Sequence, residues 1–145
     1  MKKITIILAM LLTLATAAFA NEKKVSPDVL QAFKNKFSNA TEVSWETTNT
    51  YYKAAFEING TWLNAYYSNS AQLLCVTRNI SSAQLPLYLQ NNLKQQYKDY
   101  WITDLFELTN EQGFNYYLTV QDSDYKIMLE SKDGSDWKQI VRIKY

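Results

Sequence analysis

The pattern of hydrophobic residues in this chain occurs twice after residue 25. In each half, a proline near the start of an amphipathic segment is followed by aromatic-rich stretches in which apolar and polar residues alternate. Apolar residues spaced three or four apart predict a helix, and strict alternation predicts strands with one buried face. The sequence therefore predicts an α+β fold of two tandem units, 26–80 and 81–145. Each unit has one helix packed on about four antiparallel strands, and the strands of both can join into one extended curved sheet.

The first predicted unit begins at Ser26-Pro27-Asp28, where we expect the serine hydroxyl to cap free backbone amides of a helix. Leu30, Phe33 and Phe37 then form an apolar stripe along that helix. Alternating residues between 43 and 77 predict four strands. Asn59-Gly60 predicts a type I′ hairpin turn between the second and the third, because both central positions of this turn need a positive φ.

The second predicted unit repeats this order. Leu85, Leu89, Leu93 and Tyr97 lie four residues apart and predict the apolar face of a second helix. Four further strands follow, separated by turns that contain glycine and aspartate. We expect these strands at 100–108, 114–121, 125–130 and 136–144.

The first twenty residues have the features of a signal peptide. Lys2 and Lys3 precede an apolar run over 4–18, and Ala18-Phe19-Ala20 fits a cleavage site. The run of about fifteen residues is shorter than the roughly twenty that span a bilayer. We therefore expect cleavage near Ala20 and a flexible polar leader at 21–25. The product is predicted to be soluble, periplasmic or secreted, and without a membrane span.

The charge balance argues against polyanionic partners. Loss of residues 1–20 changes the formal charge from +1 to −1, because two lysines and no acidic residue are removed. Binding to nucleic acid or to an anionic membrane needs clustered positive charge. We expect neither kind of partner.

A single cysteine, Cys75, cannot form an intramolecular disulfide. Its apolar neighbours Leu73, Leu74 and Val76 favour a buried, inert thiol on a strand. A disulfide between two chains and a reactive nucleophile are the alternatives, and the absence of histidine disfavours the second.

The sequence lacks the residue patterns of common enzymes. It has no histidine, so Ser-His-Asp and Cys-His arrangements are excluded, and its three glycines cannot form a phosphate-binding loop. Asp122 with Asp124, and Asp133 with Asp136, are more typical of turns than of calcium ligands or of a general acid and base. We therefore predict a protein that is not an enzyme and has no catalytic residue, cofactor or metal site. A carboxylate-based hydrolase is a less favoured alternative.

The high aromatic content suggests a binding surface. The tyrosine pairs at 51–52, 66–67 and 116–117 lie in predicted strands, where successive side chains point to opposite faces of the sheet. One ring of each pair must therefore point away from the helix-covered core. Exposed aromatic rings are enriched at recognition surfaces, whereas cross-strand stabilisation is the alternative explanation. The predicted partner-binding residues are Tyr51, Trp62, Tyr66 and Tyr117.

A resemblance to a known family is carried by segments 32–37, 40–46 and 52–60 and by the predicted helix from Leu85-Pro86 to Tyr97. Through these segments the chain resembles the PepSY-like family of exported proteins described as β-lactamase-inhibitor-like. The resemblance covers the whole chain after the signal peptide. It implies two tandem helix-plus-sheet units and favours binding over catalysis. We therefore predict a periplasmic, non-enzymatic and inhibitor-like module that docks an envelope protein or peptide on its open sheet face. A protein that binds a small apolar ligand in the sheet concavity is the alternative.

Overall fold

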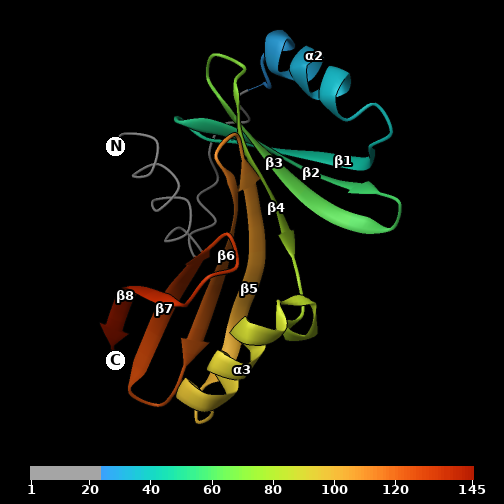
Figure 1. Cartoon of the computed structure of the whole chain (residues 1–145). Coiled ribbons are helices and arrows are strands. Elements are labelled where there is room, and N and C mark those ends of the chain that lie inside the picture. The colour runs from blue at the N-terminus through green and yellow to red at the C-terminus, as the bar shows by residue number, and fades with distance from the viewer. Residues whose placement is uncertain (1–23) are drawn as a thin grey trace.

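The computed structural model describes residues 24–145, so the predicted signal peptide, its cleavage site and most of the leader lie outside the described residues. Within 24–145 the chain forms two α-helices, a short 3-10 helix and eight strands (Figure 1). The predicted α+β class is confirmed. The helical elements are α2 (Pro27–Lys36), η1 (Ser82–Gln84) and α3 (Leu87–Gln96). The strands are β1 (Thr41–Thr47), β2 (Tyr51–Ile58), β3 (Thr61–Ser68), β4 (Leu73–Asn79), β5 (Trp101–Asn110), β6 (Gly113–Gln121), β7 (Tyr125–Lys132) and β8 (Lys138–Lys144).

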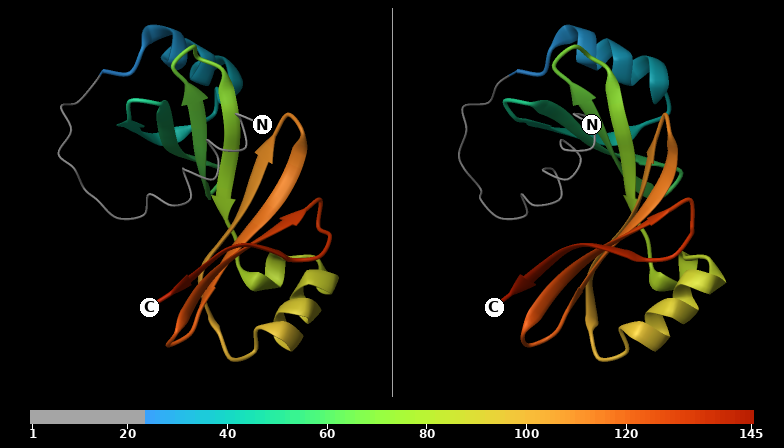
Figure 2. Two further views of the ribbon diagram at one scale, coloured as in Figure 1. Left: turned by 90° about the vertical axis from the view of Figure 1, so that its left-hand side faces the viewer. Right: turned by 60° about the vertical axis from the view of Figure 1, so that its left-hand side comes forward.

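All eight strands belong to one antiparallel sheet in which spatial order follows sequence order from β1 to β8. The sheet is strongly twisted, so its first and last strands point in different directions (Figure 2). Helix α2 lies over the β1–β3 end and α3 lies near the other end (Figure 1). The strands therefore form one continuous sheet, as the sequence indicated.

Both helices pack on the same face of this sheet. Val76 of β4 belongs to the core beneath α2, and Arg78, two residues further along the strand, shares its face. Arg78 pairs with Glu107, which in turn pairs with Tyr116 in the core beneath α3. The opposite face of the sheet, which we call the open face, therefore carries neither α2 nor α3.

Helix α2 packs through Val29 and Phe33, both buried. The Phe33 ring contacts Trp45 and Phe56 edge-on, with centroids 5.2 and 5.0 Å apart. The predicted apolar stripe was wrong at Leu30, which is 37% exposed. Residues 29, 33 and 37 also recur at helical spacing, and this row, not the one through Leu30, faces the sheet.

The start of α2 also differs from the expectation. The side chain of Ser26 makes no capping hydrogen bond, although its carbonyl oxygen accepts the Leu30 N–H at 3.0 Å. Proline at the first helical position has no N–H that needs a partner. The predicted serine cap was therefore wrong, while the predicted helix start was right.

Helix α3 carries Leu89 and Leu93 of the predicted apolar face, whereas Leu85 lies before its first residue, Leu87, at the end of η1. Leu85, Leu89 and Leu93 are buried against the second half of the sheet. The preceding turn is fixed by a reciprocal capping box between Ser81 and Gln84. The indole N–H of Trp137 donates to the Leu89 carbonyl oxygen at 3.3 Å, which ties the segment before β8 to this helix.

The predicted hairpin between β2 and β3 is confirmed. Asn59 has φ 51° and Gly60 has φ 77°, the positive values that a type I′ turn needs at both central positions. The turn sets the register in which Tyr52 pairs with Tyr67 and Lys53 pairs with Tyr66.

Tyr67 gives a first testable prediction. Its side chain is buried in the core beneath α2, and its hydroxyl has no hydrogen-bond partner. A buried unpaired polar group costs about 1–3 kcal/mol. Tyr67→Phe is therefore expected to raise the free energy of unfolding by about 1 kcal/mol, measured by urea denaturation. Tyr52→Phe at the paired position is the control, and a loss of stability in Tyr67→Phe would contradict the expectation.

Candidate binding surface on the open sheet face

Three of the four predicted anchors lie on the open face and reach its surface to different degrees. Trp62, Tyr66 and Tyr51 alternate with residues of the core beneath α2 along β3 and β2. Trp62 is 56% exposed, whereas Tyr51 and Tyr66 are half-buried. The Tyr51 and Tyr66 rings contact each other with centroids 5.7 Å apart. The structure thus brings these two rings together at one end of the open face.

Tyr117 also lies on the open face, but the prediction that it is exposed was wrong. It is 5% exposed, stacks on Phe106 with ring centroids 5.4 Å apart, and its hydroxyl donates to Oε1 of Glu130 at 2.7 Å. Burial, and then the hydrogen bond to this carboxylate, raise the pKa of Tyr117 well above its usual range. Alternation along a strand fixes which face a side chain takes, whereas burial depends on the neighbouring strands. Tyr117 therefore belongs to the buried residues of the open face and is not one of its exposed rings.

The buried residues under this surface form a third apolar cluster, separate from the two beneath the helices. The partly buried Tyr66 side chain packs against this cluster. The cluster contains residues from both halves of the sheet. Its side chains therefore pack together on the open face where the halves meet. Its buried members are Cys75, Phe106, Leu108 and Tyr117.

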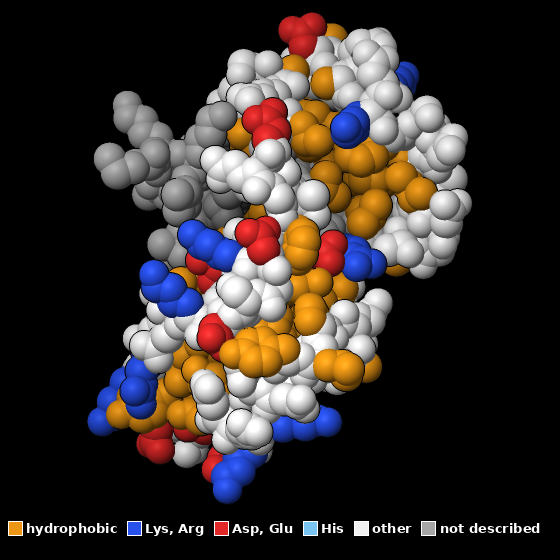
Figure 3. Space-filling view, viewed as in Figure 1, with side chains coloured by type: hydrophobic (Ala, Val, Ile, Leu, Met, Phe, Trp, Pro, Cys, Tyr) orange, Lys and Arg blue, Asp and Glu red, His pale blue; other side chains and the backbone are white. Residues whose placement is uncertain are grey.

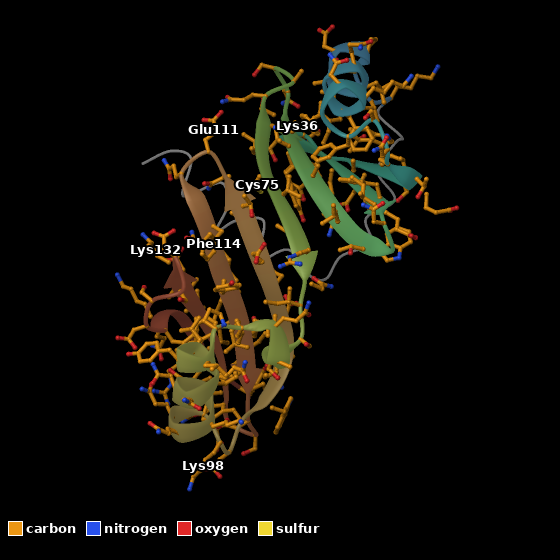
Figure 4. All side chains as sticks on the ribbon, turned by 45° about the vertical axis from the view of Figure 1, so that its right-hand side comes forward. Lys36, Cys75, Lys98, Glu111, Phe114 and Lys132 are labelled. Carbon is orange, nitrogen blue, oxygen red and sulfur yellow. The ribbon has the colours of Figure 1, made fainter. Side chains whose placement is uncertain are left out.

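Cys75 is a free, buried thiol, as the favoured interpretation predicted. It lies on β4, between the half of the sheet near α2 and the half near α3 (Figure 4). It pairs in register with Tyr66. Burial raises the pKa of Cys75 to about 12, so the thiol holds its proton at neutral pH and is a poor nucleophile.

Charged groups flank the aromatic residues of the open face. Lys53 Nζ lies 3.3 Å from Glu46 Oε2 at the β1–β2 end. At the other end, burial raises the pKa of Asp104, which pairs with Thr119 next to the buried cluster. Mixed charge around an aromatic centre resembles the polar rim and apolar core of protein interfaces.

Trp101 is a further exposed aromatic residue on this face that the sequence reasoning did not single out. Its neighbour Ile102 pairs with Val120 of the α3 core, so Trp101 points to the other side. It is 53% exposed. The available signal was the aromatic pair Tyr100-Trp101 at the start of a predicted strand. Trp101 lies at the start of β5, the strand that also carries Phe106 and Leu108 of the buried cluster.

Asp122, one of the aspartates considered as a metal ligand or as an acid–base residue, lies in the turn between β6 and β7. Asp122 Oδ1 accepts the backbone N–H groups of Asp124 and Tyr125 at 2.8 and 2.6 Å. Among residues 24–145, no group of three or more His, Cys, Asp and Glu side chains is placed to hold a metal ion. No helix in this part of the chain has the length and apolar character to cross a membrane.

The fold defines an α+β protein with two helices on one face of an eight-stranded antiparallel meander. No sequence profile of a known family matches the chain. No curated protein matches it either. Solved structures do share the fold.

One such structure is a BLIP-like protein from Bacteroides fragilis, 22% identical, with a TM-score of 0.69 over 83% of this chain and 86% of that chain. A DUF2874 family protein from Bacteroides uniformis is 17% identical, with a TM-score of 0.72 over 83% and 90%. A candidate periplasmic protein from Bacteroides eggerthii is 14% identical, with a TM-score of 0.70 over 83% and 89%. At these identities the likeness shows a shared fold, and a BLIP-like fold agrees with the predicted resemblance. Membership of the PepSY-like family stays a prediction.

Proposed function

We propose that this chain is a non-enzymatic periplasmic binding module that docks a protein or peptide of the cell envelope on its open face. Tyr51, Trp62 and Tyr66 are the proposed anchors, with Tyr117 as their buried support. The observation that carries the proposal is an exposed tryptophan and a tyrosine pair on a face that neither α2 nor α3 covers, with Tyr66 of the pair packed against a buried apolar cluster.

The geometry of these rings suits recognition. Tyrosine and tryptophan supply large contact areas with few rotatable bonds, so little conformational entropy is lost on binding. Burial raises the pKa of Tyr66 to about 12, which reflects how far its ring is already withdrawn from water. Binding energy at interfaces is concentrated in aromatic residues of this kind. A pre-ordered aromatic surface on a rigid sheet therefore favours docking.

The structural neighbours support the compartment and the mode of action. One is described as BLIP-like and another as a candidate periplasmic protein. The predicted signal peptide points to the same compartment. The signal peptide and the periplasmic neighbour support the compartment, and the BLIP-like neighbour supports an inhibitor-like module that acts by binding.

Corresponding contacts support the division into units 26–80 and 81–145. The Thr41 hydroxyl donates to the Glu57 carbonyl oxygen at 3.4 Å, and the Thr103 hydroxyl donates to the Thr119 carbonyl oxygen at 3.3 Å. Both residues of the second contact lie 62 positions after those of the first. The helix ends also correspond, because Phe37 N–H bonds to residue 33 and Tyr97 N–H to residue 93. Two related surfaces thus meet in one open face.

Substitution of the anchors tests the proposal. The Trp62→Ala/Tyr66→Ala variant is expected to lose at least tenfold in cross-linked capture of its envelope partner, because hot-spot rings cost about 2 kcal/mol or more each. Trp62→Ala alone should fold with nearly unchanged stability, since its side chain is mostly exposed. The measurement is quantitative capture from envelope extract, with circular dichroism to verify folding.

Leu87→Ala is the matched control, because Leu87 is an exposed apolar residue on α3 and lies away from the open face. Its capture should equal that of the unmodified protein. Unchanged capture by the double variant would reject the open face as the docking surface.

The alternative of a small apolar ligand on the open face is supported by the buried cluster of Cys75, Phe106 and Leu108, which offers an apolar floor. Native mass spectrometry of the purified protein separates the two ideas. A bound molecule that disappears in the Trp62→Ala/Tyr66→Ala variant would favour the alternative.

A further inference from the structure

A groove of about 560 Å³ lies between α2 and β1. In Figure 3 a hydrophobic patch occupies the surface beneath α2, over the first strands of the sheet. The groove lies on the helix-bearing side and is therefore distinct from the open face. Its lining residues are Leu30, Phe33, Lys34, Phe37, Ser38, Ala40, Val43 and Trp45.

The groove is lined mainly by apolar side chains, and its aromatic rings contact one another. Phe33 contacts both Phe37 and Trp45, with ring centroids 5.3 and 5.2 Å apart. Leu30 and Val43 line it while 37% and 40% exposed, so apolar surface at the groove faces water. Ligand sites of about 300–1,000 Å³ with mostly apolar walls and few polar groups are typical of small-molecule binding. The groove has these properties.

The second half of the chain provides an internal comparison. A groove between α3 and β5 is lined by Leu93, Lys94, Tyr97 and Tyr100, which lie 60 positions after Phe33, Lys34, Phe37 and Ala40. It measures only about 240 Å³. Tyr100 contacts the Tyr97 ring at 5.8 Å there, whereas Ala40 brings no ring to the first groove.

The backbone is alike at the two positions. The Ala40 N–H donates to the Phe37 carbonyl oxygen at 3.1 Å, and the Tyr100 N–H donates to the Tyr97 carbonyl oxygen at the same distance. A tyrosine is thus compatible with this turn. The side chain at this position is one difference between the grooves, because Tyr100 places a ring in the second groove and Ala40 places none in the first.

Charge indicates which apolar molecule fits. Lys34 is the single ionisable residue among those that line the groove, and no carboxylate of the described residues forms an ion pair with it. An apolar ligand with one negative group can place that group at Lys34 and its apolar body against Phe33, Phe37 and Trp45. The Ser38 hydroxyl, also at the groove, offers a hydrogen bond to the same group.

We propose that the groove between α2 and β1 binds a small amphiphilic anion, namely a free fatty-acid-like monocarboxylate. This site is independent of the partner docked on the open face. A failure of this proposal would therefore leave the proposed docking function on the open face untouched, and the reverse also holds.

Dodecanoate binding to the unmodified protein and to Ala40→Tyr tests the proposal by isothermal titration calorimetry. Dodecanoate is expected to bind saturably at one site below its micellar concentration. Ala40→Tyr is expected to weaken binding at least tenfold, because the new ring fills the groove. Emission of Trp45, which lines the groove, should change on binding, and this change should be absent in Trp45→Phe.

Three further comparisons test the charge and the position of the proposed site. Lys34→Gln should weaken dodecanoate about fivefold and leave dodecanol unchanged, and dodecylamine should bind the unmodified protein more weakly than dodecanoate. Leu30→Glu, at an exposed position, blocks the groove independently of Ala40→Tyr and remains informative if that variant fails to fold. Non-saturable binding, equal binding by Ala40→Tyr or Leu30→Glu, or equal affinity for dodecylamine would each overturn the proposal.

Discussion

Phe56→Ala is expected to lower the free energy of unfolding by about 3–5 kcal/mol, as deletion of a large buried aromatic ring does. Phe56 is fully buried and belongs to β2. Its ring contacts Phe33 at 5.0 Å and Phe37 at 4.7 Å, so it joins α2 to the sheet. Stabilities of natural domains are about 5–15 kcal/mol, and a loss of this size leaves the protein close to unfolding.

Urea denaturation followed by circular dichroism measures this effect, and two variants serve as controls. Phe56→Leu retains most of the apolar volume and should cost less than about 2 kcal/mol. Phe114→Ala removes the same ring from a partly exposed position on β6, and its effect should also be much smaller. A loss below about 1.5 kcal/mol in Phe56→Ala would show that α2 contributes little to the stability of the sheet.

The same packing shows why the sequence predicted the elements well and the helix orientation less well. Alternation in β2 and β3 and the Asn59-Gly60 turn are local signals, and local signals fix strand type and register. The face by which α2 contacts the sheet is not local. Val29 and Leu30 both fit a helical stripe with Phe33, and the sheet beneath decides that Val29 is buried.

The exposure of individual side chains on the open face could not be predicted from local sequence patterns either. Alternation placed Tyr66 and Tyr117 on the side away from the helices, and the structure has both rings there. Tyr117 is nevertheless buried, because β6 is an inner strand and Phe106 of the neighbouring β5 covers its ring. A sequence pattern carries no information on how a twisted sheet packs neighbouring side chains above an inner strand.

The first strand of each half contains irregular pairing that the sequence did not indicate. β1 changes register between Thr41 and Ser44, where Glu42 has φ 52°, and β5 changes register between Ile102 and Asp104. Bulges of this kind re-aim the side chains that follow them. Val43 and Ile102 line the two helix-side grooves close to these irregularities. Both grooves therefore depend on features without a sequence signal.

The two proposed sites divide the sheet by face. The open face has rings over a buried cluster and is suited to a large, relatively flat partner. The groove beside α2 is lined mostly by apolar side chains and by Lys34, which pairs with no carboxylate of residues 24–145, and this suits a small anionic ligand. Since the sites lie on opposite faces, a partner and a small ligand can be bound together. Variants in one site should leave binding at the other unchanged.

Alkaline pH is expected to unfold the protein, because several groups hold their protons far more tightly in the folded state. Burial raises the pKa of Cys75 from 9.0 to about 12 and that of Tyr66 and Tyr67 from 10.0 to about 12. Below pH 9 both states are protonated and these groups make stability independent of pH. Between pH 9 and 12 the unfolded chain releases protons that the folded protein retains, so unfolding becomes more favourable.

Each such group lowers the free energy of unfolding by about 1.4 kcal/mol per pH unit within its window. Cys75 acts alone between pH 9 and 10, and the buried tyrosines add to the slope above pH 10, so the total loss by pH 11 is on the order of several kcal/mol. Urea denaturation at pH 8, 9, 10 and 11 measures it. Cys75→Ala should abolish the slope between pH 9 and 10, whatever its effect on stability at pH 8. An identical slope in that variant would mean that the thiol is not buried in the folded protein, and the apolar cluster beneath the open face would lose one of its four buried members.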